Sequence, residues 1–221
     1  MKVSLIALTQ SHIPCITTAE DIIVYAARVS NPANQLNTET GERLLRYCIR
    51  HGHWSVFETA SMTLEIKTSR AIAAQILRHR SFTFQEFSQR YAEASDFEPI
   101  ELRMQADKNR QSSSEVLSNE KLTNEVREYI NDAIDNYEYL LEKGVARECA
   151  RMILPLCTQT TLYMTGSVRS WIHYFQQRLS EHTQKEHREV AQAAHEIFKQ
   201  QFPTISNAIN TQTTETGGQP S

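Results

Sequence analysis

Apolar and polar residues follow two different periods along this chain, which predicts a mixture of strands and helices. Over residues 61–67 every second residue is apolar, the pattern of a strand with one buried face. Over residues 70–80 the apolar residues recur with a helical period, and Ser69 stands where a capping hydroxyl is expected. By the same reasoning we expect further strands at 3–8 and 160–165, and further helices at 18–28, 39–51, 117–143, 146–154, 168–179 and 184–202.

Weaker patterns lie between these elements. Residues 82–91 have an extended pattern, whereas residues 94–118 are polar and irregular. The last residues, NTQTTETGGQPS, are low in complexity, so we expect residues 206–221 to form a disordered polar tail. No repeat or linker divides the rest of the chain. The sequence therefore predicts a single α+β domain over residues 1–205, rich in helix, with a small mixed or antiparallel sheet.

Composition narrows the possible function classes. Hydrophobic residues make up 40% of the 221 residues, which is enough for a packed core, and the formal net charge is −3. A negative balance argues against bulk nucleic-acid binding, although it permits small basic pockets for single nucleotides. The four cysteines form no CxxC pair, and no apolar run is long enough to span a membrane. The first residues, MKVSLIALTQSHIP, lack the long apolar region and cleavage site of a signal peptide, so we expect them to form a strand. We expect a soluble cytoplasmic protein without nucleic-acid or membrane partners.

The most unusual stretch is RHRSFTFQEFSQRY, which begins at Arg78. Gln75, Arg78 and His79 have the spacing that places them on one face of the predicted helix. Cations at a helix C-terminus also complement the helix dipole, which is worth about 0.3–1 kcal/mol each, so this motif alone has a purely structural explanation.

The residues that follow favour ligand binding. In an extended segment Glu86, Ser88 and Arg90 point to the same side. An acid, a hydroxyl and a guanidinium beside further arginines suit a phosphate and a hydrogen-bonding base, because the arginine fork matches phosphate oxygens. The alternative is an exposed edge strand in which Glu86 neutralises Arg90.

Four blocks of the sequence resemble the flavin-dependent thymidylate synthases, in the order found in that family. The motif Arg78-His79-Arg80, seven residues and then Ser88 is similar to the family signature. The segments HGHWSVFE, GVARECARMILP and SVRSWIHYFQQR resemble its flavin-contacting, phosphate-binding and flavin- and uracil-contacting segments. The resemblance implies a homotetramer of α+β subunits with shared active sites, no Rossmann fold and no enzyme nucleophile; the chain has six glycines and no GxGxxG.

The resemblance also assigns roles to residues. It implies that dUMP is bound by Gln75, Arg78, Glu86, Phe87, Ser88, Gln89, Arg90, Arg147 and Arg178. Within this set Ser88, Arg90 and Arg147 would hold the phosphate, and Arg178 would lie against the uracil edge as the catalytic residue that stabilises developing negative charge. It implies that FAD is bound by His53, Ser55, Arg78, His79, Arg80, Glu86, Ser167, Arg169 and His173.

The implied reaction is the reductive methylation of dUMP to dTMP. NADPH would reduce FAD, 5,10-methylenetetrahydrofolate would supply the carbon, and the reduced flavin would supply the hydride. The chain departs from the family where many members have Asn, at Ser167, His173 and Gln85, and Gln89 stands at a position that is often small.

Other readings of these residues remain open at this point. The Phe82, Phe84 and Phe87 side chains among basic residues could instead hold single-stranded nucleic acid by stacking, and a phosphohydrolase would need a carboxylate cluster that the sequence does not show. Ser88 could be a nucleophile, although no histidine is near it in sequence. His51 and His53 lack a third ligand, so we expect no metal.

Overall fold

The structure, a computed structural model, describes residues 1–90 and 96–216, so Tyr91, at the end of the expected extended segment, lies outside the described residues. The chain divides into two compact units. The first unit contains Met1, Lys67–Arg78 and Glu86–Leu162, and the second contains Lys2–Ile66, His79–Gln85 and Tyr163–Ser221. The chain crosses from one unit to the other inside single strands. The division therefore does not test the expectation of one domain, which stays a prediction.

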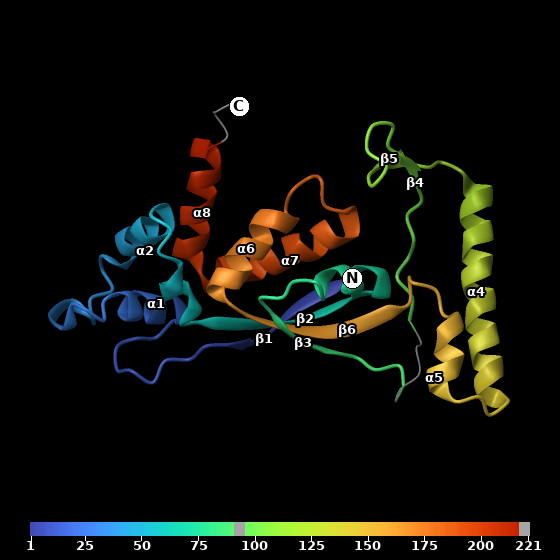
Figure 1. Cartoon of the computed structure of the whole chain (residues 1–221), viewed down its shortest axis with the longest axis horizontal. Coiled ribbons are helices and arrows are strands. Elements are labelled where there is room, and N and C mark those ends of the chain that lie inside the picture. The colour runs from blue at the N-terminus through green and yellow to red at the C-terminus, as the bar shows by residue number, and fades with distance from the viewer. Residues whose placement is uncertain (91–95, 217–221) are drawn as a thin grey trace. The chain divides into compact units, whose positions relative to one another are not determined.

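A four-stranded sheet organises the second unit. Its strand order is β1-β2-β6-β3, with bounds β1 Lys2–Leu8, β2 Ser61–Ser69, β6 Gln159–Ser167 and β3 Thr83–Glu86. Figure 1 shows α6 (Val168–Arg178) and α7 (Lys185–Gln201) on one side of this sheet, and α7 contacts β1. The remaining helices of the unit are α1 (Ala19–Ala27), α2 (Gly41–Arg50), α8 (Pro203–Thr216) and the 3-10 turns Pro32–Asn34 and Trp54–Glu58.

Capping side chains determine where several helices begin. Thr18 forms a capping box with Asp21 at the start of α1: its hydroxyl accepts from the Asp21 amide at 3.0 Å. Ser69 caps α3 by accepting from the Ile72 amide at 3.4 Å. The Ser167 hydroxyl accepts from the Ser170 amide at 3.3 Å and so fixes the first turn of α6, directly after β6. These caps explain why β2 and β6 each pass into a helix without a loop.

The first unit contains helices and a short hairpin. Its helices are α3 (Arg70–Ile76), α4 (Glu120–Glu142) and α5 (Arg147–Ala150), with a 3-10 turn at Arg151–Ile153. Gly144 ends α4 with a φ of +82°, a conformation that favours glycine. Figure 1 shows α5 beside α4, and the two helices are in contact. A two-stranded antiparallel hairpin pairs β4 (Arg103–Gln105) with β5 (Ser113–Val116).

Comparison with the sequence-based expectations confirms the α+β class. The hairpin contradicts the expected irregular course of 94–118: its strands carry no alternating apolar pattern, and its loop is held by polar groups such as Gln105, whose amide donates to the Ser112 carbonyl at 2.9 Å. Ala94 and Ser95 lie outside the described residues. The expected tail begins inside α8, which extends to Thr216, and residues 217–221 are not described.

Two further expectations, both for the segment around Arg78–Arg90, are wrong. The helix expected over 70–80 ends at Ile76, because the Arg78 amide donates to the Gln75 carbonyl at 3.4 Å in a tighter turn. Arg78, His79 and Arg80 therefore lie beyond α3 and share no helix face. The extended segment expected over 82–91 is a strand only over Thr83–Glu86, and a turn follows at Gln89 and Arg90.

The core of the second unit depends on a close approach between Phe82 and Gly166. Phe82 is 7% exposed, and its ring lies 4.9 Å from the Trp171 ring, edge to face. A Cβ atom on Gly166 would lie 2.5 Å from two carbons of the Phe82 ring. The Trp171 indole donates to the Met62 carbonyl at 3.1 Å, which ties α6 to β2.

We expect Gly166→Ala to destabilise the protein by about 1–3 kcal/mol, because the added methyl group overlaps a ring that is enclosed by other aromatic residues. The measurement is the free energy of unfolding from urea denaturation, at constant protein concentration. The same substitution made in a Phe82→Leu background should cost less, since the colliding ring carbons are then absent. An equal loss of stability in both backgrounds would show that the close approach is not the cause.

Candidate functional site

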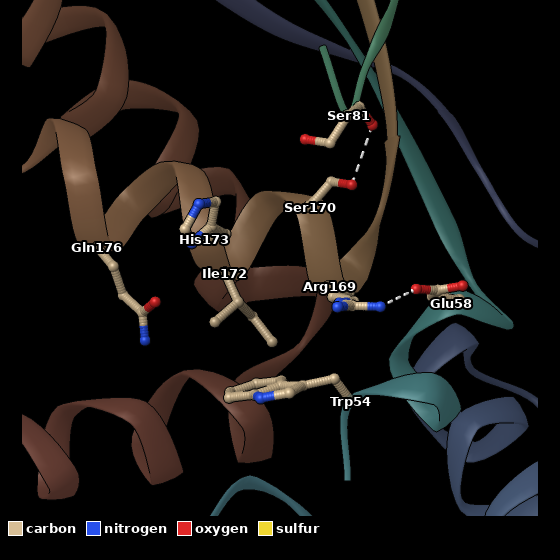
Figure 2. A pocket seen from close by; sticks show the side chains of 8 residues that line it. All are labelled: Trp54, Glu58, Ser81, Arg169, Ser170, Ile172, His173 and Gln176. Carbon is tan, nitrogen blue, oxygen red and sulfur yellow. Dashed lines mark hydrogen bonds and ion pairs between the residues drawn. The ribbon is translucent and has the colours of Figure 1, made fainter. Parts of the chain in front are cut away.

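One face of α6 lines a pocket of the second unit. Arg169, Ile172, His173 and Gln176 recur with helical spacing and face the Trp54 indole and Glu58 of the 3-10 turn Trp54–Glu58 (Figure 2). Ser81 and Ser170 complete the lining. We call this cavity of about 410 Å³ the α6 pocket. Its volume lies within the range of small-molecule sites, about 300–1,000 Å³.

Polar contacts hold the walls of the α6 pocket in place. The Arg169 guanidinium pairs with the Glu58 carboxylate, and each side chain is about half exposed (Figure 2). The Ser170 hydroxyl donates to the Ser81 carbonyl at 3.0 Å, which joins α6 to the segment that leads into β3. His173 lies at the pocket wall and contacts the Gln177 amide at 2.8 Å. Exposed ion pairs are weak, so Arg169 can exchange its carboxylate partner for a ligand anion.

A second group of side chains, which we call the His79 cluster, lies at the end of α6. Arg178, the last residue of α6, donates through Nε to Nε2 of His79 at 2.9 Å. The His79 ring lies 5.0 Å from the Tyr174 ring and 6.1 Å from the His187 ring, both edge to face. Tyr174 and His187 are 1% and 0% exposed. The cluster consists of these four residues.

The two imidazoles of the His79 cluster are neutral near pH 7, because the pKa values of His79 and His187 are lowered. Burial, followed by the charges of Arg178 and His173, lowers the pKa of His79 to about 4. Burial and the charges of Arg178 and His79 lower the pKa of His187 to about 3. Burial raises the pKa of Tyr174. Near neutral pH, therefore, Arg178 carries the only charge among these four side chains.

The first unit contains a separate arginine group, which we call the α5 cluster: Ser88, Arg90, Arg147 and Glu148. Arg90 pairs with Glu148 at 3.0 Å, and both side chains are 55% exposed. This pair brings the segment after β3 to the first turn of α5, where Arg147 stands. The Ser88 hydroxyl accepts from the Arg90 amide at 3.4 Å. Among the described residues no histidine bonds to Ser88, so the structure shows no base for a nucleophile there.

Glu86 has partners other than the one considered from the sequence. The Thr160 hydroxyl donates to Glu86 Oε1 at 3.0 Å, and Arg70 lies 3.7 Å from the same oxygen. Arg90 pairs with Glu148 instead, so the Glu86–Arg90 ion pair of the edge-strand alternative is wrong, although β3 does lie at the edge of the sheet. Glu86 is thereby fixed at the end of β3 with one carboxylate oxygen engaged.

The remaining expected site residues are distributed between the two units. In the first unit Gln75 is partly exposed and Arg78 and Phe87 are exposed. Gln89 is 3% exposed, and its amide nitrogen has no partner among the described residues. In the second unit His53, Ser55 and Arg80 are exposed. The His53 ring lies 5.7 Å from the Tyr47 ring. Ser167, an expected flavin contact, uses its hydroxyl to cap α6.

Several residues of these groups were not anticipated from the sequence. Ile172 and Gln176 stand three and seven residues after Arg169, so the helical period alone could have placed them in the α6 pocket. Trp54 and Glu58 belong to the segment HGHWSVFE, which resembles the flavin-contacting segment of the family, and both line the α6 pocket. Tyr174 and His187 gave no signal, because a buried aromatic face on a helix usually means core packing.

Two absences hold for the part of the chain that the structure describes. There, no three histidine, cysteine or acidic side chains gather in a way that could hold a metal ion. None of the described helices is both long enough and apolar enough to cross a membrane.

These features first define a class: an α+β protein with a pocket lined by Trp54 and Arg169, an arginine beside neutral imidazoles, and a further group of two arginines. Such groups suit anionic planar ligands such as nucleotides. The family model described as "Thymidylate synthase complementing protein" matches residues 13–204. The chain belongs to the flavin-dependent thymidylate synthase family and is an enzyme of that class. The resemblance inferred from the sequence is therefore confirmed.

Individual relatives agree with this assignment. A probable flavin-dependent thymidylate synthase of Paramecium bursaria Chlorella virus 1 is 52% identical over 95% of this chain and 99% of its own length. The flavin-dependent thymidylate synthase of Synechocystis sp. is also 52% identical, with the same coverage. The crystal structure of the UMP/dUMP methylase PolB from Streptomyces cacaoi, bound with 5-Br dUMP, superposes with a TM-score of 0.81. It is 27% identical and covers 95% of this chain and 94% of its own.

Proposed function

We propose that this enzyme converts dUMP to dTMP, with FAD as cofactor, NADPH as reductant and 5,10-methylenetetrahydrofolate as carbon donor. The observation that carries the proposal is the Arg90–Glu148 pair, which brings two expected phosphate ligands, Arg90 and the first residue of α5, to one place. The names of the relatives support the flavin, and the 5-Br dUMP in the neighbouring structure supports a uracil nucleotide. The four free cysteines are compatible with a reducing cytoplasm, where we place the reaction.

The α6 pocket fits part of a flavin nucleotide. Its volume of about 410 Å³ accepts a planar ring system, the Trp54 indole offers an apolar face, and Arg169 offers a cation that pairs with the exposed carboxylate of Glu58. We assign FAD binding to this pocket and to the residues expected from the family: His53, Ser55, Arg78, His79, Arg80, Glu86, Ser167, Arg169 and His173. Bound FAD would supply hydride transfer, for which the chain offers no group of its own.

The α5 cluster is our proposed phosphate site. Arg90 and Arg147 present guanidinium forks, and Ser88 presents a hydroxyl at the turn that precedes Arg90. The Arg90–Glu148 pair is half exposed and so worth about 0–1 kcal/mol, which a charge-assisted contact to phosphate can replace. Ser88 would therefore bind substrate and form no covalent bond with it.

The base and sugar of dUMP would meet the other assigned residues. Arg178 faces the uracil in this proposal, and its fixed positive charge stabilises negative charge that develops on the ring. Glu86, held by Thr160, accepts from donors on the nucleotide through its second oxygen. Gln75, Arg78, Phe87 and Gln89 complete the proposed substrate contacts. Gln89 offers a buried amide whose N–H groups suit a substrate oxygen.

We expect Arg90→Ala and Arg147→Ala to lose most of the affinity for dUMP, and Ser88→Ala to keep measurable dTMP formation. The reason is that a charge-assisted hydrogen bond is worth about 1.5–3 kcal/mol and a neutral hydroxyl contact about 0.5–1.5 kcal/mol. Calorimetry of dUMP binding and assays of dTMP from dUMP check this, with Arg103→Ala, whose guanidinium pairs with exposed Glu101, as the control. Loss of all turnover in Ser88→Ala with intact dUMP binding would restore the nucleophile.

We further propose that the active form is a homotetramer whose sites combine residues of different chains. Support comes from apolar side chains exposed on the first unit: Tyr129 and Met152 are 71% and 79% exposed, and Leu156 is 69% exposed. Large exposed apolar side chains on α4 and near α5 indicate a surface that an oligomer would cover. Arginines would also repel one another at a site within one chain, whereas assembly around bound anions lets them converge.

A mixing experiment tests the shared sites. Inactive Arg90→Ala and inactive Arg178→Ala subunits are dissociated, mixed and reassembled, and dTMP formation is measured. If the two arginines of one site come from different chains, some sites in the hybrids contain both, so activity should partly return. Hybrids that form, as shown by native mass spectrometry, and remain inactive would contradict shared sites, as would turnover by a monomer.

A further inference from the structure

Arg178, the last residue of α6, has an unusual hydrogen-bond partner for an arginine. Its Nε donates to Nε2 of His79 at 2.9 Å, and among the described residues no carboxylate pairs with it. The usual partner of an arginine is Asp or Glu, which orients the guanidinium and also neutralises its charge. A neutral imidazole orients the guanidinium and leaves its charge intact.

The chemistry of this hydrogen bond fixes the state of the imidazole. Arg178 has only donors, so His79 Nε2 must be unprotonated and the ring proton must lie on Nδ1. The surroundings favour that neutral form. The groups that face the His79 ring are Arg178, His173 and Tyr174 of α6, His187 of α7, and Phe82 from its own segment. None of them is an acid that would stabilise an imidazolium.

The packing also restricts the orientation of the His79 imidazole ring. Tyr174 and His187 are almost fully buried and enclose His79 at 5.0 Å and 6.1 Å between ring centroids. Because the imidazole cannot rotate freely between these rings, Nε2 stays directed at Arg178. With Nε engaged, the plane of the guanidinium is set, and its two terminal nitrogens remain available for a ligand.

We propose that His79 is a positioning residue for Arg178: its neutral imidazole aims the guanidinium at the substrate without neutralising it. The inference rests on the proposed function, in which Arg178 faces the uracil of dUMP. It gives His79 a role on the substrate side, beside the flavin contact that the family resemblance implies. His79 Nδ1–H and the backbone of His79 remain for such a flavin contact.

Two amide substitutions separate this role from general packing. His79→Gln can place an amide oxygen near the position of Nε2 and accept from Arg178, whereas His79→Asn places its amide near Nδ1 and cannot reach. We expect His79→Asn to lower kcat/KM for dUMP about tenfold or more, the effect of a lost charged hydrogen bond. We expect His79→Gln to lose much less. FAD content, measured by absorbance, and the melting temperature should be the same in both variants.

A double-mutant cycle completes the test. Binding of dUMP is measured by calorimetry for the FAD-loaded wild type, His79→Asn, Arg178→Ala and the double variant. If His79 acts through Arg178, adding His79→Asn to Arg178→Ala should change dUMP affinity by less than about twofold. Additive losses, or equal losses in the Gln and Asn variants, would overturn the inference and leave the proposed function standing. A wild-type protein that binds neither FAD nor dUMP would overturn both.

Discussion

The contact between Phe82 and Gly166 is the constraint on which the α6 pocket, our proposed flavin site, depends. The Phe82 ring lies so close to Gly166 that any side chain at position 166 would collide with it. The segment from His79 to Gln85 therefore packs directly against β6 and the start of α6. The Ser170–Ser81 and Arg178–His79 hydrogen bonds then join the two ends of α6 to that same segment. The α6 pocket and the His79 cluster are both consequences of this attachment.

The arginines of the α6 pocket, the His79 cluster and the α5 cluster share one property: among the described residues none of Arg169, Arg178 and Arg90 forms a buried ion pair. Arg169 and Arg90 pair with exposed carboxylates, and Arg178 bonds to a neutral imidazole. Exposed pairs contribute little to stability and are screened by salt, so they can be exchanged for ligand anions. When a cofactor supplies the redox chemistry of an enzyme, the protein contributes mainly binding and orientation of the ligands and a positive electrostatic potential around them.

Much of the fold could be predicted from local signals, because caps and periods act over a few residues. Thr18, Ser69 and Ser167 begin helices as capping hydroxyls do, and the alternation in 61–67 marks β2 correctly. The end of α3 could not be predicted, because it depends on the turn at Arg78 and on contacts of His79 and Phe82 with α6, whose residues lie about 90–100 positions away in the sequence. Family likeness named Arg178 and His79 separately. Their hydrogen bond is a property of the folded chain.

The most direct test of the account is the visible absorption spectrum of the purified protein, followed by calorimetric titration with FAD. We expect flavin absorption bands, either at once or after FAD is added, and a binding stoichiometry close to one FAD per chain, because Trp54, Arg169 and His173 form a pocket of suitable size and charge. A correctly folded protein that stays colourless and releases or absorbs no heat with FAD would contradict the account.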